Sequence, residues 1–210
     1  RAFQSGEEGI VSTAFWGNVS FIECRFEGAV NFRNSCIYGR TDFTKSTFEE
    51  LANFEESTFG QNAFFNWCKF EKEHRFQNSF FVQKANFMNT EYWENASFQS
   101  AVFNAECQLS VSKFFKYADL SLIDSRGHML VNYTEFLGKA NFSHAHFNRN
   151  FDFVNTINQK TDFSHTVFMG KAKFFGATTA ETLDFKSCFF LFGKPEIAIE
   201  EAKLLFDEDH

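Results

Sequence analysis

Histidine and cysteine are the residue types in this chain that could support chemistry. The sequence contains six His and five Cys among 210 residues. His144 and His165 are 21 residues apart, with His146 close by, and imidazoles that a fold brings together can bind a transition metal. The cysteine spacings match no zinc pattern, and we find no nucleophile elbow, phosphate-binding loop or His-Glu-x-x-His run. What these side chains can do therefore depends on the elements that position them.

Phenylalanine is the most unusual feature of the composition, with 34 residues, and it recurs at regular spacing. Large apolar residues, which we call centres, follow one another at alternating steps of five and six residues from Ile10 to Phe190. One residue is missing from this series between Asn158 and Phe163. The position two before each centre is small, as in Ala52. Two inward residues separated by one outward residue indicate a strand, so the sequence predicts a solenoid of short strands.

Charged residues indicate how many strands make one coil of this solenoid. Opposite charges placed across neighbouring strands are favourable, whereas like charges are not. Two series of charged residues alternate in sign at a spacing of 22 residues: Lys69, Glu91, Lys113 and Glu135, and Glu50, Lys72, Glu94 and Lys116. A coil of 22 residues with four sides turns both series into ladders of opposite charge.

Units such as Ala52-Asn53-Phe54-Glu55-Glu56 and Ala85-Asn86-Phe87-Met88-Asn89 resemble the pentapeptide-repeat family. The resemblance implies an all-β fold, a right-handed quadrilateral parallel β-helix with the small residue and the central Phe inside. The chain departs from a uniform five-residue step, and we expect the extra residue at alternate corners, as a turn or bulge. We expect an N-terminal lead-in or cap over 1–8, the β-helix over 9–192, and a short capping helix with an acidic tail over 193–210.

The register decides how the cysteines and histidines are interpreted. Cys24, Cys68, Cys107 and Cys188 occupy small inward slots, and Cys36 faces outward. Free inward thiols behave as small apolar residues and favour a reducing, cytoplasmic compartment. His144 and His165 each lie two residues after centres that are four sides apart, so we expect them one above the other.

The stacked histidines leave two interpretations open, a surface pair or a weak transition-metal site. We favour the surface pair and expect no metal and no cofactor. His74 falls in a small inward slot, where a hydrogen-bonded histidine or a corner histidine is more typical than a ligand.

Outward-facing aromatic residues are the better candidates for a functional site. Trp93, Phe115 and Leu137 follow one another at 22-residue spacing, one residue after their centres, and form a predicted apolar stripe. A second stacked pair, Trp16 and Tyr38, is expected on another side, and Trp67 is a further exposed aromatic residue. Contiguous exposed apolar surface is typical of an interaction site, either with another protein or in a homodimer.

The C-terminal segment follows Pro195 and has an amphipathic pattern. We expect a helix that closes the last coil or pairs with a second copy. Its apolar residues are Ile197, Ile199, Leu204, Leu205 and Phe206.

The sequence favours a non-catalytic structural or protein-interaction module whose protein partner is unknown. One option is self-association, as a homodimer, through the stripe or the C-terminal helix. The net charge is −7, of which −4 falls on residues 194–210, so we expect no nucleic-acid binding. Two alternatives stay open from the resemblance: mimicry of DNA that protects DNA gyrase, and a targeting or spacer domain of a larger effector or membrane protein. The chain begins with Arg1 rather than Met, so we expect a piece of a longer protein. It contains no apolar run long enough for a membrane span, so we expect no transmembrane segment in this chain.

Overall fold

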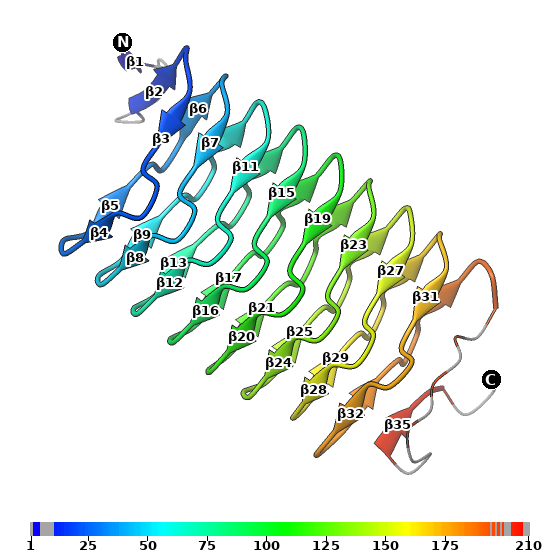
Figure 1. Ribbon diagram of the computed structural model, residues 1–210. Coiled ribbons are helices and arrows are strands. Elements are labelled where there is room, and N and C mark those ends of the chain that lie inside the picture. Colours follow the sequence, from blue (N-terminus) through cyan, green and yellow to red (C-terminus); the bar gives the residue numbers. More distant parts are fainter. Residues whose placement is uncertain are drawn as a thin grey trace.

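The computed structural model describes residues 2–4, 11–193, 195, 197, 199 and 203–207. Its strands form four sheets, which we call sheets A to D, on the four sides of one elongated solenoid (Figure 1). Strands of consecutive coils pair in parallel, as Lys69 with Glu91 and Glu91 with Lys113. The predicted coil of 22 residues with four sides is confirmed.

Most strands contain only two residues, because each side of the coil ends at a corner. Sheet A comprises β1 (Ala2–Gln4), β2 (Val11–Phe15), β6 (Ser35–Ile37), β10 (Thr58–Phe59), β14 (Phe80–Phe81), β18 (Val102–Phe103), β22 (Asp124–Ser125), β26 (His146–Phe147), β30 (Val167–Phe168) and β34 (Phe189–Phe190). Sheet B comprises β3 (Val19–Ser20), β7 (Thr41–Asp42), β11 (Ala63–Phe64), β15 (Ala85–Asn86), β19 (Cys107–Gln108), β23 (Met129–Leu130), β27 (Phe151–Asp152) and β31 (Ala172–Lys173).

The other two sheets follow the same rule on the remaining sides. Sheet C comprises β4 (Arg25–Phe26), β8 (Thr47–Phe48), β12 (Lys69–Phe70), β16 (Glu91–Tyr92), β20 (Lys113–Phe114), β24 (Glu135–Phe136), β28 (Ile157–Asn158) and β32 (Thr178–Thr179). Sheet D comprises β5 (Val30–Asn31), β9 (Ala52–Asn53), β13 (His74–Arg75), β17 (Ala96–Ser97), β21 (Ala118–Asp119), β25 (Ala140–Asn141), β29 (Thr161–Asp162), β33 (Leu183–Asp184) and β35 (Leu204–Leu205).

Two kinds of corner explain the alternating steps. At the five-residue steps, after sheets B and D, fifteen non-glycine residues have φ between 54° and 62°. Asn, which tolerates this left-handed conformation, occurs there at Asn34, Asn78, Asn89 and Asn155. The extra residue lies at the other corners, after sheets A and C, as predicted. There the coils approach closely, and a Cβ at Gly127 would overlap the backbone of Ala105.

The interior is filled by columns of stacked aromatic rings. Within sheet C the rings of Phe48 and Phe70 are 4.7 Å apart and nearly parallel, at 4°. Rings of neighbouring columns meet edge to face, as Phe65 and Phe76 do at 5.1 Å. The parallel sheets place every centre above its counterpart one coil earlier, so stacking follows directly from the register.

Polar side chains hold the five-residue corners. At seven small slots of sheets A and C a hydroxyl donates to the carbonyl of a centre in the preceding coil, at 2.5 to 2.9 Å. These donors are Ser46, Ser57, Ser79, Thr90, Ser112, Thr134 and Thr166. On sheets B and D, Asn or Asp accepts from a backbone N–H two residues ahead at eight corners, an Asx turn.

The missing residue before Phe163 is absorbed at one corner. Two residues instead of three connect β28 to β29, and Ala140 still pairs in register with Thr161. Asn158 takes a centre position and donates to the Thr178 carbonyl at 2.9 Å and to the Thr156 hydroxyl at 3.0 Å. The ladder of strands therefore continues through this coil.

The first coil is covered by a strand. β1 pairs antiparallel with β2, with Phe3 opposite Ser12. The predicted lead-in over 1–8 thus contains a strand over Ala2–Gln4. The first predicted centre, Ile10, lies outside the described residues.

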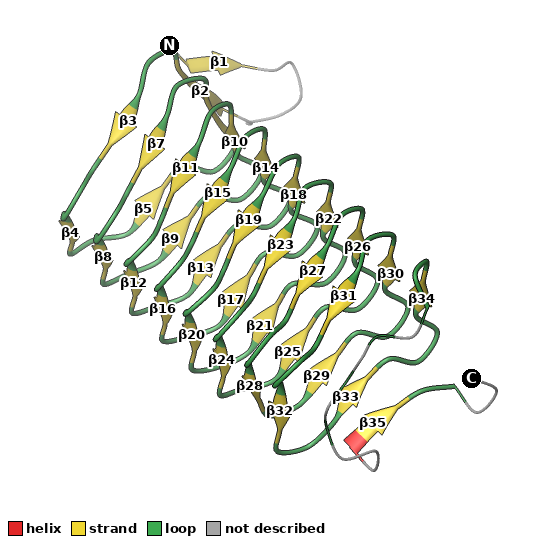
Figure 2. Ribbon diagram, turned by 45° about the vertical axis from the view of Figure 1, so that its right-hand side comes forward, coloured by secondary structure: helices red, strands yellow, loops and turns green. Residues whose placement is uncertain are grey.

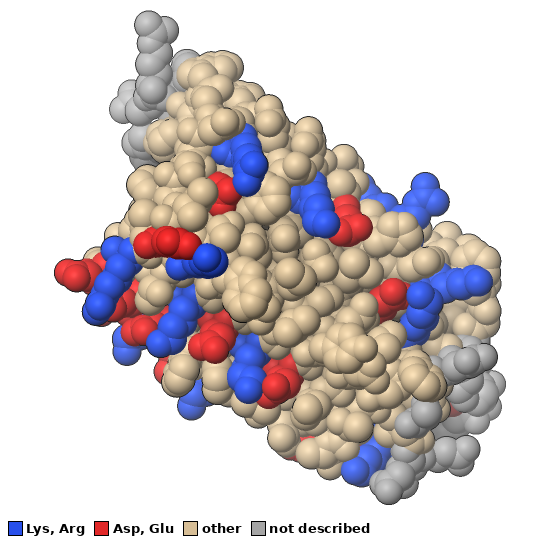
Figure 3. Space-filling model, viewed as in Figure 1, with Lys and Arg blue, Asp and Glu red and all other residues tan. Residues whose placement is uncertain are grey.

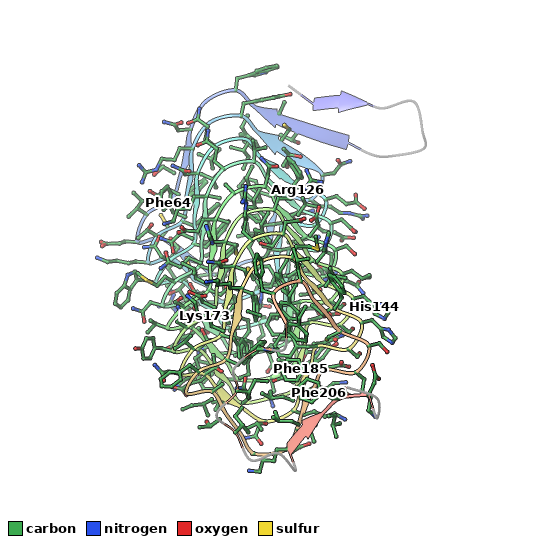
Figure 4. The ribbon with its side chains drawn as sticks, turned by 90° about the vertical axis from the view of Figure 1, so that its right-hand side faces the viewer. Phe64, Arg126, His144, Lys173, Phe185 and Phe206 are labelled. Atoms are coloured by element: carbon green, nitrogen blue, oxygen red, sulfur yellow. The ribbon has the colours of Figure 1, made fainter. Side chains whose placement is uncertain are left out.

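The prediction of a C-terminal helix through Leu204 and Leu205 is wrong, because these two residues form β35, which adds in parallel to β33 (Figure 2). Residues 195, 197 and 199 are likewise not helical. A strand is favoured here since the last coil presents unpaired backbone groups, which a helix would leave exposed. Phe206 continues the Phe column with its ring 5.3 Å from Phe185 (Figure 4). Ile197, Ile199, Leu204 and Phe206 pack against the core, so the segment closes the solenoid as expected.

Candidate protein-contact surface

The outer face of sheet C carries the predicted apolar stripe of Trp93, Phe115 and Leu137. The Trp93 and Phe115 rings stack at 4.6 Å with an angle of 24° between them. Trp93 is 42% exposed and Leu137 38%, whereas Phe115 is half-buried between them. They come together because each follows a sheet C centre by one residue, and the strands β16, β20 and β24 pair in register. The structure thus brings the three predicted residues into one continuous surface.

Charged side chains frame the stripe and pair with one another. Lys113 lies 2.9 Å from Glu135 on the next coil, and Lys69 lies 2.8 Å from Glu71 on its own coil. The hydrogen bond from Lys69 is the main cause that lowers the pKa of Glu71. The Lys69 ammonium also lies 4.9 Å from the centre of the Trp93 ring, a cation–π contact.

A shallow groove of about 460 Å³ runs beside the stripe, at the corner between sheets B and C. Its walls include Trp67, Val111 and the side chains of the ladder Lys69, Glu91 and Lys113. Trp67 and Val111 are 53% and 46% exposed, and both have φ of 62°. A bulky or β-branched residue in this conformation is unusual, so these apolar side chains face solvent at a cost in backbone strain. The groove therefore adds exposed apolar residues on the other side of the charged ladder from the stripe.

The second predicted pair lies on the other side of the solenoid, after sheet A. The Trp16 and Tyr38 rings stack at 4.5 Å and 8°, and they are 68% and 46% exposed. The stacking is as predicted. The pair is not part of the sheet C surface, because it follows strands β2 and β6 of sheet A.

The predicted stacking of His144 and His165 is confirmed. Their rings are 4.7 Å apart at 8°, and both lie at left-handed corners, exposed to solvent (Figure 4). Among the described residues no third His, Cys, Asp or Glu completes a group that could hold a metal ion. The pair is best interpreted as a surface stack.

The five cysteines are free thiols. Cys68 and Cys107 are buried, and Cys24 and Cys188 are half-buried in the same inward slot. Burial raises the pKa of Cys68 and of Cys188 to about 12, so these thiols are poor nucleophiles at neutral pH. The Sγ of each donates to a centre carbonyl of the preceding coil, in place of the usual hydroxyl.

His74, predicted as a hydrogen-bonded or a corner histidine, lies inside the aromatic core. It is fully buried, with its ring 4.7 Å from Phe70 and 4.6 Å from Tyr92. Neither ring nitrogen has a well-formed hydrogen bond among the described residues, and the Tyr92 hydroxyl is also without one. Burial lowers the pKa of His74 to about 3. The imidazole is therefore a neutral, stacked member of the aromatic core.

The sequence reasoning missed two residues of the surface, Val111 and Tyr133. Both share the corner column of Trp67 at 22-residue spacing, and Tyr133 is 61% exposed. The signal was present in the register, two residues after the sheet B centres, but this corner position was not searched for apolar residues.

Part of the chain matches a known protein family. Residues 21–66 match a family model described as pentapeptide repeats, in nine copies. This stretch consists of pentapeptide repeats. The register of parallel strand pairs continues as far as Phe190, beyond the matched residues.

Two solved structures are similar to this chain over most of its length. They are HetL, a pentapeptide-repeat protein, and QnrB1. HetL, involved in regulation of heterocyst differentiation in the cyanobacterium Nostoc sp. strain PCC 7120, is 12% identical, over 98% of this chain and 94% of its own, with a TM-score of 0.29. Trypsin-treated QnrB1, a plasmid-mediated fluoroquinolone resistance protein, is 14% identical, over 94% of this chain and 92% of its own, with a TM-score of 0.32. At these sequence identities and TM-scores, the role of neither protein is transferred to this chain. No curated protein matches the chain.

In the part of the chain that the structure describes, no helix has the length and apolar character needed to cross a membrane.

Proposed function

We propose that this chain is a non-catalytic interaction module that presents the outer face of sheet C to a protein partner. The exposed stack of Trp93 on Phe115 is the observation that carries the proposal. Aromatic rings in a contiguous apolar surface, framed by charged residues, are typical of protein contacts. The solenoid supports this role because its rigid core holds the face flat and leaves stacked rings where a catalytic cavity would have to form.

The charge distribution argues against mimicry of a nucleic acid. Such mimicry needs a field of one sign, whereas Figure 3 shows basic and acidic side chains lying side by side on the visible face. Lys84 with Glu106 and Lys173 with Asp152 are two such pairs on sheet B and its corners. We therefore do not extend the gyrase-protection role to this chain.

The test is affinity capture with three forms of the protein: the parent, Trp93→Glu with Phe115→Glu, and Trp16→Glu. The last variant introduces the same change on the other exposed aromatic stack and is the matched control. We expect the parent and the control to retain a common protein that the double variant loses. Equal retention by all three forms would place the contact elsewhere, and turnover or specific binding of a small metabolite would contradict the proposal.

A further inference from the structure

The charges on sheet C are arranged antisymmetrically about the middle of the sheet. The sheet has eight strands, in the order β4 to β32, and its midpoint lies between β16 and β20. The first residues of the four central strands are, in order, Lys69, Glu91, Lys113 and Glu135. Reversing this order changes the sign at every position, because the charges alternate along the four coils.

A second copy of the chain can be placed against this face by a two-fold axis. The axis lies in the plane of the face, runs parallel to the strands and passes between β16 and β20. The axis reverses the order of the coils and leaves each column of side chains opposite itself. It therefore places Lys69 opposite Glu135 and Glu91 opposite Lys113 of the second copy. Each pair occurs twice, as in any interface in which both copies use the same patch.

The neighbouring columns fit the same axis. It places Trp93 opposite Phe115, next to the axis, and Trp67 opposite Tyr133 in the corner column. At the corner after sheet C, the exposed Glu94 comes opposite Lys116.

The remaining positions of these columns add no repulsion. Arg25 faces Thr178, and the acidic Glu49 and Glu71 face Gln159 and Leu137. Along the whole length of sheet C, all of which the structure describes, no facing pair carries like charges.

A parallel arrangement fits less well. An axis along the solenoid would keep the coils in order and exchange the columns on either side of the centres. On sheet C only Lys69 with Glu71 and Arg25 with Glu27 would then face opposite charges, fewer pairs than the antiparallel axis forms. The charges thus select the antiparallel arrangement.

The size of the face suits a stable contact. Eight strands at about 4.8 Å spacing give a length of roughly 40 Å, and a side of five or six residues is about 18 Å wide. The footprint is roughly 700 Å², close to the ~800 Å² that each partner buries in an interface of standard size. The axis at the midpoint lets the two faces overlap over their full length.

We propose that the partner of sheet C is a second copy of this chain, bound face to face and antiparallel about this axis. The inference rests on the proposed function, since it names the occupant of the same surface. The apolar stripe supplies the buried area, and the charge ladder fixes the direction and register of the second solenoid.

The test is light scattering and sedimentation of the full chain over a concentration series. We expect a dimer for the parent. Lys113→Glu puts one carboxylate opposite Glu91 at each of two symmetric places, and should weaken dimerisation by roughly ten-fold or more. Arg126→Glu makes the same charge change on sheet A, in an exposed residue paired with Asp124, and should leave the dimer unchanged.

A rescue variant separates the contact between copies from the ladder within one chain. Adding Glu91→Lys to Lys113→Glu restores opposite charges across the axis but places like charges side by side within each chain. Recovery of the dimer supports the proposal, and circular dichroism of each variant confirms that it folds.

Two outcomes would overturn the proposal: a parent that stays monomeric throughout, or a dimer that Lys113→Glu does not weaken. If the parent is monomeric but still captures another protein through Trp93, only the dimer proposal is rejected and the proposed function stands. If the parent captures no protein and dimerises through another face, both the dimer proposal and the proposed function are rejected.

Discussion

Acidification should destabilise this fold through His74. The imidazole is fully buried between Phe70 and Tyr92, and burial is the first cause that lowers its pKa from 6.5 to about 3. In the unfolded chain the same group should titrate near its ordinary value. The folded protein therefore keeps His74 neutral at pH values where the unfolded chain already binds a proton.

The sign and size follow from this difference. Because the folded pKa is the lower one, the stability present above pH 6.5 is lost as the pH falls from 6.5 towards 3. Each pH unit in this window costs about 1.4 kcal/mol, which gives a total of roughly 5 kcal/mol. Between pH 6.5 and 5 the expected loss from this single group is about 2 kcal/mol.

The assay is urea-induced unfolding of the parent and of His74→Ala across this pH range. Alanine already fills the same slot in the coils on either side, at Ala52 and Ala96, so the variant should fold. Every other titratable group is the same in the two proteins, so the difference between the two pH profiles isolates His74.

We expect His74→Ala to lose less stability than the parent as the pH falls. His144→Ala removes an exposed histidine and is the matched control, whose profile should follow that of the parent. Parallel profiles for the parent and His74→Ala would refute the reasoning, because they would show that His74 binds protons equally in the folded and unfolded states.

Three further substitutions test the core and the corners by their effect on the free energy of unfolding. Tyr92→Phe should stabilise the protein by about 1 kcal/mol, since it removes a buried hydroxyl that has no well-formed hydrogen bond. A loss of stability would show that a contact with the Thr90 side chain satisfies the hydroxyl. Val111→Asn should stabilise the protein by about 1 kcal/mol, because it relieves the backbone strain of a β-branched residue at φ 62°. The same change at Val102, which lies in an extended strand, should not stabilise it, and equal effects would rule out backbone strain as the cause. Ser79→Ala should cost about 1 to 2 kcal/mol through the lost bond to a buried carbonyl, while the outward Ser97→Ala stays near neutral, and equal costs would contradict the role of the hydroxyl.

Much of the fold could be predicted because the repeat is checked at every step along the chain. The alternation of five and six residues placed Phe48, Phe70 and Phe114 in one column, and their stacking follows from that spacing. The stacked pairs of Trp93 with Phe115 and of His144 with His165 came from the same arithmetic. Position in a coil is a local property, so the sequence is sufficient for it.

The hydroxyl ladder was visible but was interpreted too generally. The small slot was treated as a requirement for size alone. The structure shows that a Ser or Thr in seven slots of sheets A and C, as in Ser57 and Ser79, donates to a centre carbonyl of the preceding coil, although Ala101 and Ala145 fill the same slot on sheet A. Sheets B and D do not present that carbonyl, and Ala serves there, as in Ala63 and Ala85.

The sequence by itself determined the number of sides, the register and the side chains that point inward, because parallel stacking repeats one local rule in every coil. Only the tertiary structure decided the rest. Leu204 and Leu205 fit an amphipathic helix, but the unpaired edge of β33 makes a strand the better partner. The environment of His74 depends on Tyr92 in the next coil, and the groove beside Trp67 depends on Val111 two coils away. Those neighbours are set by the stacking of whole coils, which no local pattern contains.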